Sequence, residues 1–398
     1  MHAAQVLRRC LSKALDFIHR RRLVVLLGAV HALIEGQRLT LMDLARSWPD
    51  AERVAAPLKK LDRLLGNVHL HDELAAIYAA ITAWCTQALV RPVIIVDWSD
   101  LDRRGRYCLL RAALAVGGRS LTLWECVCPM KHIGSPRVQN ALLRALRAAM
   151  PSHVRPILVT DAGFMAPWFE AVTALGWDYV GRLRNRMLVK PSHVPDLPGE
   201  WLPCRALYEL VVTAARDLGM FDVVRNHPIA CRLVVYRAPK KGRVHRNRSG
   251  ARARSKRSQA NARREAEPWL LAVSPSLGLS ANAVVKLYAR RMQIEQSFRD
   301  LKSHRYGVGF EDSQTRSAPR LAVLLLIQAL VGFLAWYATR TASVVAYRSA
   351  VASFTRVVAS VSHSWHRVGV TLLRRQHWRP NPTTFSNTPL ELLGGLPP

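Results

Sequence analysis

The sequence is short of acidic residues. Its 398 residues include 27 Asp and Glu against 58 Lys and Arg, a formal net charge of +31. Half of the chain is hydrophobic, which excludes a disordered tail protein, and the basic excess favours a polyanionic partner. Arginine, which binds phosphate through two hydrogen bonds, is commoner than lysine. We expect nucleic acid, although a ribosomal-type protein, a membrane-surface protein or an arginine-rich genome gives a similar composition.

Cysteine is also sparse, and its spacing excludes the common zinc motifs. The seven cysteines are odd in number, and no two have the C-x-x-C spacing of a zinc site. The first residues show neither the apolar core nor the cleavage site of a secretory leader. We therefore expect reduced, mostly buried thiols in a cytoplasmic protein.

Long hydrophobic runs are scarce as well. The one near-continuous run, residues 321–337, is 17 residues long and contains Gln328 near its middle. That length lies at the lower limit for a membrane span. We expect a buried helix here and no membrane partner.

The first 88 residues have the apolar spacing of helices. Thr40 and Asp43 resemble a capping box with Asp in place of Glu, so a helix is expected to begin there. A second helix is predicted from 52 to 65, ending at Gly66. It carries four cations: Arg53, Lys59, Lys60 and Arg63. Residues 1–88 are predicted to form a helical domain that binds DNA in a helix-turn-helix-like manner, although any small bundle with a basic face looks similar.

The spacing of apolar residues changes after residue 88. Short apolar runs predict strands, and longer amphipathic runs predict helices between them. The expected strands are 92–96, 107–116, 120–127, 156–159, 177–182 and 269–273, with helices at 136–149 and 165–175. This order predicts a mixed α/β sheet, assigned to a catalytic domain of residues 89–184 and 266–315.

Two further regions complete the predicted organisation. Residues 185–265 read as a β-rich insertion with strand-like runs at 207–214 and 230–236. The insertion ends in a basic stretch, 237–264, which contains no Asp or Glu and is expected to be a loop that meets phosphate. Residues 316–398 are predicted to be a basic, helical C-terminal region and a candidate for dimerisation.

The most informative segment carries Tyr288, Arg291, Glu295 and Lys302. On one helix these four side chains fall within about 60° of arc. An adjoining stripe is apolar and consists of Leu287, Ile294, Phe298 and Leu301. The pattern predicts one helix packed on the core, with a reactive edge that faces an anion. The alternative is a surface helix with solvated charges.

Three carboxylates are candidates for chemistry. Asp97 and Asp161 follow buried strands, where ligands gather in α/β sheets, and Glu295 lies on the late helix. Carboxylate oxygens suit Mg²⁺ or Mn²⁺, and two such ions can clamp an in-line phosphoryl transfer. Each residue has a structural alternative. Asp97 can cap a turn, with Asp100 as a rival for its role; Asp161 can form an Asx-turn before Gly163; and Glu295 can simply pair with Arg291.

These residues resemble the motifs of the DDE transposases of bacterial insertion sequences. Tyr288, Arg291, Glu295 and Lys302 match the Y-x2-R-x3-E-x6-K signature of a subgroup that cuts and pastes through a DNA hairpin. Asp97 in Ile-Val-Asp-Trp-Ser-Asp and Asp161 in Thr-Asp-Ala-Gly-Phe resemble the first two acidic motifs. The resemblance extends over nearly the whole chain.

The resemblance implies an RNase H-like catalytic core in which Asp97, Asp161 and Glu295 bind two Mg²⁺ or Mn²⁺ ions. It also implies that Tyr288, Arg291 and Lys302 hold phosphates beside the scissile bond. Trp269 corresponds to a tryptophan that stacks on a flipped base, with a plain core residue as the alternative. The implied partners are double-stranded DNA, as terminal inverted repeats and target, and a second subunit. The implied location is the bacterial cytoplasm, at the nucleoid.

The expected function is therefore cut-and-paste transposition by metal-dependent phosphoryl transfer. The steps are end nicking, hairpin formation, hairpin opening and strand transfer. One alternative is a catalytically inactive, end-binding repressor of transposition. Another is a stand-alone metal-dependent nuclease with little preference for ends.

Overall fold

The computed structural model describes most of the chain. The described residues are 15–102, 104–184, 187–192, 199–211, 214–238, 255–256, 267–305, 307–342, 346, 350 and 365–374. They divide into two compact units. The first unit comprises Met1–Pro156 and Arg290–Pro398, and the second comprises Ile157–Ala289. This division cuts across the four predicted segments, so each unit is described by itself.

Three antiparallel strands form the sheet of the first unit. They are β1 (Val93–Asp100), β2 (Tyr107–Ala115) and β3 (Ser120–Pro129), with β2 in the middle. Apolar, β-branched side chains make β1 a buried strand, as predicted. The register sets Asp97 opposite Arg111 and Arg111 opposite Glu125, so one row of charged residues crosses all three strands.

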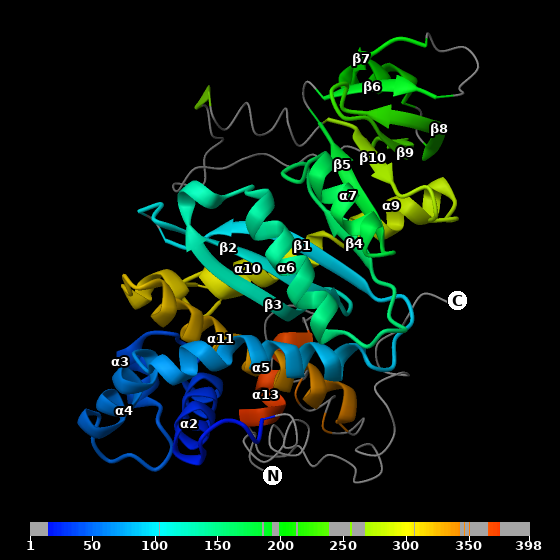
Figure 1. The fold of residues 1–398 in the computed structure, drawn as a ribbon. Helices are drawn as coiled ribbons and strands as arrows, with labels where there is room; N and C mark the ends of the chain where they lie inside the picture. Colours follow the sequence, from blue (N-terminus) through cyan, green and yellow to red (C-terminus); the bar gives the residue numbers. More distant parts are fainter. Residues whose placement is uncertain are drawn as a thin grey trace. The chain divides into compact units, whose positions relative to one another are not determined.

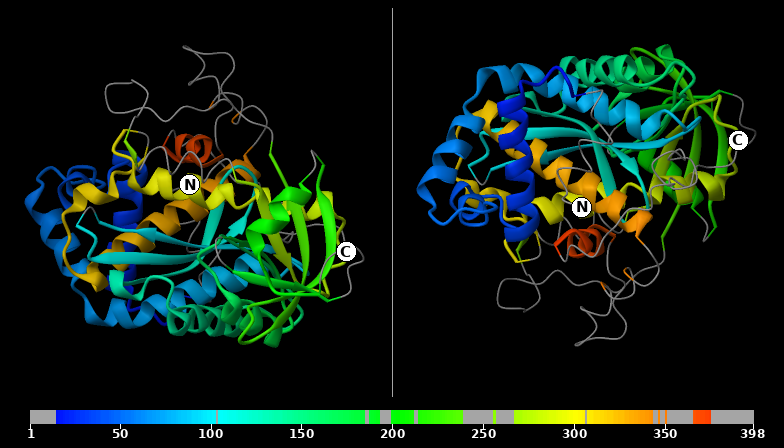
Figure 2. Two further views of the ribbon diagram at one scale, coloured as in Figure 1. Left: turned by 90° about the horizontal axis from the view of Figure 1, so that it is seen from above. Right: turned by 90° about the horizontal axis from the view of Figure 1, so that it is seen from below.

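Helices cover this sheet. Their bounds are α2 (Arg20–Gly36), α3 (Leu41–Arg46), α4 (Ala55–Leu65), α5 (Val68–Thr86), α6 (Pro136–Ala149), α10 (Met292–Lys302), α11 (Ala318–Thr341) and α13 (Trp365–Arg374), with 3-10 turns η1 (Met130–His132) and η3 (Phe310–Ser313). α6 and α10 lie on opposite faces of the three strands (Figures 1 and 2). α2, α11 and α13 pack together, as the view from below in Figure 2 shows.

Most of the helices agree with the sequence. The predicted capping box is confirmed, because the Asp43 backbone N–H donates to Thr40 Oγ1 at 3.1 Å. α4 ends at Gly66 and α6 spans 136–149, both as predicted. The stripe of Leu287, Ile294, Phe298 and Leu301 is buried. These helices were predictable because capping and apolar spacing are local signals.

The long apolar run forms the interior of α11. Among the described residues, α11 is the one helix long and apolar enough to cross a bilayer, and 83% of its most apolar window is buried inside the protein. It packs on α13, where Gly369 is required: a Cβ there would come within 2.0 Å of the Ala335 carbonyl oxygen. The expectation of a buried helix agrees with this packing.

The second unit contains a seven-stranded arrangement. Its strands are β4 (Ile157–Thr160), β5 (Asp178–Leu183), β6 (Leu188–Pro191), β7 (Leu202–Pro203), β8 (Arg216–Val223), β9 (Ile229–Tyr236) and β10 (Trp269–Val273). Their order is β4-β5-β10-β9-β8-β6-β7, in which β4 and β5 are parallel and the other neighbours antiparallel. The helices are α7 (Ala166–Ala174), α9 (Ala281–Ala289) and the 3-10 turn η2 (Cys204–Leu210). Together the units give the predicted mixed α/β class.

Three sequence predictions were wrong. The helix expected through 287–302 is broken: α9 ends at Ala289 and α10 begins at Met292. The strand-like run at 207–214 begins in η2 instead, and strand β8 was missed. β1 also extends to Asp100, so Asp97 lies inside the strand and not after it. The basic stretch 237–264 lies outside the described residues, apart from 237–238 and 255–256.

Candidate active site

Asp97 is a buried carboxylate in the middle of a strand. The residue is 7% exposed, and its Oδ1 accepts a hydrogen bond from the Trp98 backbone N–H at 2.8 Å. Because β1 continues to Asp100, Asp97 does not cap a turn. A buried carboxylate is costly unless a cation or hydrogen-bond donors compensate it. The partner of Asp97 therefore decides what this position can do.

Arg291 is that partner, and it also holds Glu295. Its Nη1 lies 3.3 Å from Asp97 Oδ2, and its Nη2 forms an ion pair with Glu295 Oε1. The Arg291 side chain is only 16% exposed, whereas that of Glu295 is 38% exposed. One guanidinium thus joins two carboxylates that are 198 residues apart in the sequence (97 to 295). The pairing of Glu295 with Arg291, which the sequence offered as a structural alternative, is present, and Asp97 shares the same guanidinium.

A second charged network supports this site from the neighbouring strands. Arg111 forms a buried ion pair with Glu125, in which Nη2 and Oε2 are 2.6 Å apart. The Tyr78 hydroxyl donates to the other Glu125 oxygen at 2.6 Å. The Arg111 guanidinium also lies 5.0 Å from the Phe298 ring centroid, a cation–π contact with α10. This network fixes α10 against β2 and β3, and so fixes the helix that carries Glu295.

The sequence analysis missed this supporting network. A signal was available, since Arg111 and Glu125 interrupt otherwise apolar strands in Leu-Leu-Arg-Ala-Ala and Leu-Trp-Glu-Cys-Val. Charged residues are almost never fully buried unless they are paired. Two opposite charges within consecutive predicted strands therefore indicated a cross-strand ion pair.

Lys302 ends α10 and is half-buried. Burial lowers the pKa of its ammonium group, while the nearby Asp100 and Glu311 carboxylates act in the opposite direction. Asp100 therefore lies near enough to Lys302 to favour its charged form. Its position at an exposed strand end contrasts with the buried Asp97.

Asp161 lies in the second unit, directly after β4. Its Oδ1 accepts a hydrogen bond from the Gly163 backbone N–H at 2.8 Å, which is the Asx-turn that the sequence offered as an alternative. A Cβ at position 163 would lie 3.0 Å from this oxygen, so glycine allows the close approach. The turn orients one carboxylate oxygen at the carboxyl end of a buried strand. This local role does not conflict with a catalytic one.

Tyr288 and Trp269 pack against each other in the second unit. Their ring centroids are 4.9 Å apart with the planes at 70°, an edge-to-face contact between α9 and β10. Tyr236 approaches the same Trp269 ring at 5.8 Å. Tyr288 is 3% exposed, so it does not share an open stripe with Glu295, contrary to the single-helix prediction.

The donor set of the first unit fits a divalent cation. Asp97 and Glu295 offer carboxylate oxygens, the ligands that Mg²⁺ and Mn²⁺ prefer, and both already face one positive charge, that of Arg291. Within either unit, the described residues contain no cluster of three His, Cys, Asp or Glu side chains that could hold an ion. Asp161 belongs to the other unit.

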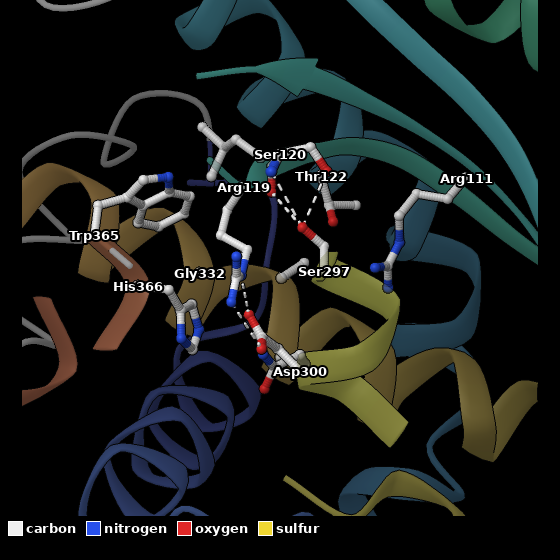
Figure 3. Close-up of a pocket in the computed structure, with 12 residues that line it drawn as sticks. Arg111, Arg119, Ser120, Thr122, Ser297, Asp300, Gly332, Trp365 and His366 are labelled. Atoms are coloured by element: carbon white, nitrogen blue, oxygen red, sulfur yellow. Dashed lines mark hydrogen bonds and ion pairs between the residues drawn. The ribbon is translucent and has the colours of Figure 1, made fainter. Parts of the chain in front are cut away.

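A cavity of the first unit lies elsewhere on α10 (Figure 3). It is lined by Arg119 and Asp300, which form an ion pair at 2.5 Å, and by Trp365 and His366 of α13. Burial lowers the pKa of the His366 imidazole. None of the predicted site residues lines this cavity. The cavity lies between α13 and α10, away from the pair of Asp97 and Glu295.

Comparisons with known proteins place the chain in a family. Its sequence matches the family model described as "Transposase DDE domain" over residues 89–331. No curated protein matches it. Among solved structures, the chain is similar to the piggyBac transposase synaptic complex with hairpin DNA, at 10% sequence identity and a TM-score of 0.38, covering 100% of this chain and 83% of that one. This structural likeness is too low to carry an argument, so the assignment depends on the family model.

The family match includes all three candidate carboxylates, Asp97, Asp161 and Glu295. It implies the RNase H-like core that the sequence predicted, and members of the family generally depend on divalent metal ions. Because the matched residues make up more than half of the chain, the protein belongs to the transposases with a DDE domain.

Proposed function

We propose that this transposase moves an insertion sequence by a cut-and-paste reaction with a DNA-hairpin intermediate. The observation that carries the proposal is the joining of Asp97 and Glu295 by Arg291. Two signature residues, Arg291 and Glu295, meet in this arrangement with Asp97, which was predicted from a distant part of the sequence. Such a group is suited to phosphoryl transfer, in which positioning and charge stabilisation do most of the work.

Four phosphoryl transfers make up the proposed reaction. Water attacks the phosphorus at the end of the element, and the bond to the 3′ oxygen breaks to release a 3′-OH. That hydroxyl attacks the opposite strand, forms a new phosphodiester as a hairpin and releases the flanking DNA. A second water opens the hairpin and regenerates the 3′-OH. The hydroxyl then attacks target DNA, which displaces a target 3′ oxygen.

The acidic residues would hold the metal ions in this reaction. Asp97, Asp161 and Glu295 would bind two Mg²⁺ or Mn²⁺ ions. When bound, such ions neutralise charge on the attacking and leaving oxygens. Release of Asp97 and Glu295 would free the Arg291 guanidinium to bind a phosphate in two-pronged fashion.

The remaining signature residues would position the DNA. Lys302 is half-buried beside Asp100 and can present its ammonium group to a phosphate. The hydroxyl of Tyr288, a residue of α9, would contact a DNA phosphate. Trp269 would stack on a base that leaves the duplex during hairpin formation, in exchange for its edge contact with Tyr288.

The assembly expected for this reaction is a homodimer on two paired ends. Its DNA partners would be the terminal inverted repeats and the target, with α4 among the end-binding elements because it exposes Lys59, Lys60 and Arg63. We expect the protein in the bacterial cytoplasm at the nucleoid and not in a membrane.

Cleavage of end DNA tests the proposal. Purified protein is incubated with labelled duplexes that carry the terminal repeats flanking its coding sequence, with Mg²⁺ or with EDTA. Products are resolved on a denaturing gel beside those of the Glu295→Ala variant. We expect metal-dependent nicks and hairpins at the terminus, absent from the variant.

Two other outcomes would identify the rival functions. Specific binding of the terminal duplex without cleavage, in Mg²⁺ and in Mn²⁺, would point to an end-binding repressor and sink the catalytic proposal. Metal-dependent cutting at many positions, without terminal preference or strand-transfer products, would point to a stand-alone nuclease.

A further inference from the structure

A group of cations in the first unit has no role in the function proposed above. The sequence from Cys126 to Thr160 contains no Asp or Glu, and its Lys and Arg residues are Lys131, Arg137, Arg144, Arg147 and Arg155. Lys131, Arg137 and Arg144 are exposed and Arg147 is half-buried. We refer to these four residues of η1 and α6 as the α6 ridge. Within the described part of the chain, none of the four forms an ion pair with a carboxylate.

Helical spacing brings the ridge onto one side of α6. Arg137, Arg144 and Arg147 fall within about 80° of arc on a helix of 3.6 residues per turn. The opposite side is buried and consists of Gln139, Leu142, Leu143 and Leu146. α6 packs through that side on α5 and β3. The arginines therefore point toward solvent, and an anion can reach them there.

The ridge begins at the end of the sheet where β1 ends with Asp100, three residues after Asp97. The register sets Asp100 of β1 opposite Cys108 of β2, and Cys108 opposite Cys128 of β3. η1 follows two residues later and is held there by a hydrogen bond from the Met130 backbone N–H to the Arg106 carbonyl at 2.9 Å. Lys131 is thus near the end of β1 that carries Asp100.

From that edge, α6 runs back toward the start of β1. Its far end leads to Arg155, whose backbone N–H donates to the Val90 carbonyl at 2.8 Å, just before β1 begins. α6 lies on the face of the three strands opposite α10 (Figures 1 and 2). The ridge therefore starts near Asp100, close to the candidate active site in β1, and lies on the face of the sheet that does not carry Glu295.

Helix stability accounts for Arg147, a cation in the last turn of α6, but not for Arg137. Arg137 lies in the first helical turn, which contains no acidic residue, and Ser135 makes no side-chain capping bond. A cation at a helix N-terminus opposes the helix dipole, at a cost of about 0.3–1 kcal/mol. Arg137 is exposed, opposes the helix dipole and forms no ion pair with a described carboxylate. We infer that its partner is an anion that is not part of this chain.

We propose that the α6 ridge binds the phosphate backbone of duplex DNA that extends from the active-site edge. The inference rests on the proposed function, which supplies DNA as the polyanion. Arg137 and Arg144 are about 10 Å apart along the helix, so both can contact phosphates of one duplex. Contacts of this kind position DNA and read no bases. The ridge thus adds affinity for duplex of any sequence.

Salt dependence of binding is the test. Fluorescence anisotropy measures the affinity of the full chain for a random duplex of 30 base pairs over a range of salt concentrations. The double variant Arg137→Gln/Arg144→Gln removes two proposed phosphate contacts. We expect the slope of log K against log salt to become shallower by about 1.8, since each phosphate contact contributes about 0.9.

A matched control removes the same charge elsewhere. Arg216 and Arg225 are exposed arginines of the second unit, at the start of β8 and in the turn after it. Arg216→Gln/Arg225→Gln is expected to change the slope by less than about 0.5. An equal change in both double variants would mean a net-charge effect and would overturn the proposal. Thermal unfolding completes the control, because Arg137→Gln should leave the melting temperature equal or higher.

The source of the DNA is distinguished by a second probe, a duplex that ends in the terminal repeat. A slope change on both duplexes identifies general duplex contact, as for target DNA; a change on the terminal duplex alone identifies the transposon end. An unchanged slope on both overturns the proposal. Failure of the proposed function is a separate result, because the wild-type protein would then not cleave DNA. The salt dependence of binding would still show whether the α6 ridge contacts phosphate.

Discussion

The two halves of the signature segment differ in what surrounds them. In α10, Glu295 and the preceding Arg291 belong to a charged cluster with Asp97. In α9, Tyr288 is buried edge-to-face against Trp269 and belongs to an aromatic contact. Residues only three positions apart, Tyr288 and Arg291, thus have opposite environments and lie in different units. A signature that looks uniform in sequence combines a charge-bearing half with a packing half.

Substitutions in the two halves of the segment should therefore have different consequences. Removing a charge from the α10 half should alter chemistry while leaving packing largely intact. Truncating the α9 half should alter stability first, because a buried aromatic side chain contributes mainly through area removed from water.

The largest expected effect is on cleavage by Asp97→Ala. Loss of this buried carboxylate, a proposed metal ligand, should reduce end cleavage by at least about 1,000-fold, equivalent to about 4 kcal/mol of transition-state stabilisation. End binding should change by less than about threefold, since phosphate contacts dominate affinity. Gel assays of cleavage and binding measure both. Asp100→Ala is the matched control, and a loss of equal size there would transfer the role from Asp97 to Asp100.

Truncation in the aromatic half should act on stability. Tyr288→Ala removes a buried ring and should lower the free energy of unfolding by about 3 kcal/mol. Tyr288→Phe keeps the contact with Trp269, so its melting temperature should stay near that of the wild type, while end cleavage falls about tenfold through loss of the hydroxyl. Denaturant unfolding and the gel assay separate the two effects. If Tyr288→Phe cleaves as well as the wild type, the residue has a packing role only.

Removal of the Arg291 guanidinium should lower cleavage but increase the stabilisation of the protein by metal ions. Arg291→Gln should lower cleavage by about 100-fold, because a donor to the transferring phosphate is lost. Asp97 and Glu295 would then lose the guanidinium that competes with a metal ion, so Mn²⁺ should raise the melting temperature of the variant more than that of the wild type. Thermal shift at several Mn²⁺ concentrations measures the difference. An equal shift in both proteins would contradict the competition between Arg291 and metal.

The smallest expected effect concerns Tyr78, a tyrosine of the charged network. Burial, reinforced by the Glu125 carboxylate, raises the pKa of Tyr78 well above its usual value of 10.0. The unfolded chain therefore loses this proton first, and stability should fall as the pH rises above about 10 toward the folded-state pKa. Tyr78→Phe should cost about 1 kcal/mol at neutral pH and flatten this decline.

Unfolding at pH 9 to 11 measures that effect, with Tyr107→Phe as a matched control. Tyr107 is less buried, and its hydroxyl donates to the Arg316 carbonyl at 3.2 Å and not to a carboxylate of the described residues. The control should therefore retain the wild-type decline. A decline in Tyr78→Phe as steep as in the wild type would assign the alkaline loss to other groups.

Helices and strands with complete local signals were predictable. The α6 bounds follow from Pro136 in its first turn and a strong apolar face, and β10 follows from a short apolar run. The break at Arg290 and Arg291 was not predictable, because no Gly or Pro marks it. The chain turns there through bonds such as Gln293 N–H to the Arg290 carbonyl at 2.9 Å. Helical periodicity continues across such a turn and so conceals it.

The sequence by itself determined the basic character, the mixed α/β class and the candidate residues, since charge, spacing and apolar period are written along the chain. Only the tertiary structure decided that Arg291 joins Asp97 to Glu295, that Tyr288 is buried on Trp269, and that Arg111 and Glu125 pair beneath α10. The physical reason is sequence separation: Asp97 and Arg291 are 194 positions apart. Local propensities carry no information about such a contact, which depends on strand register and helix packing.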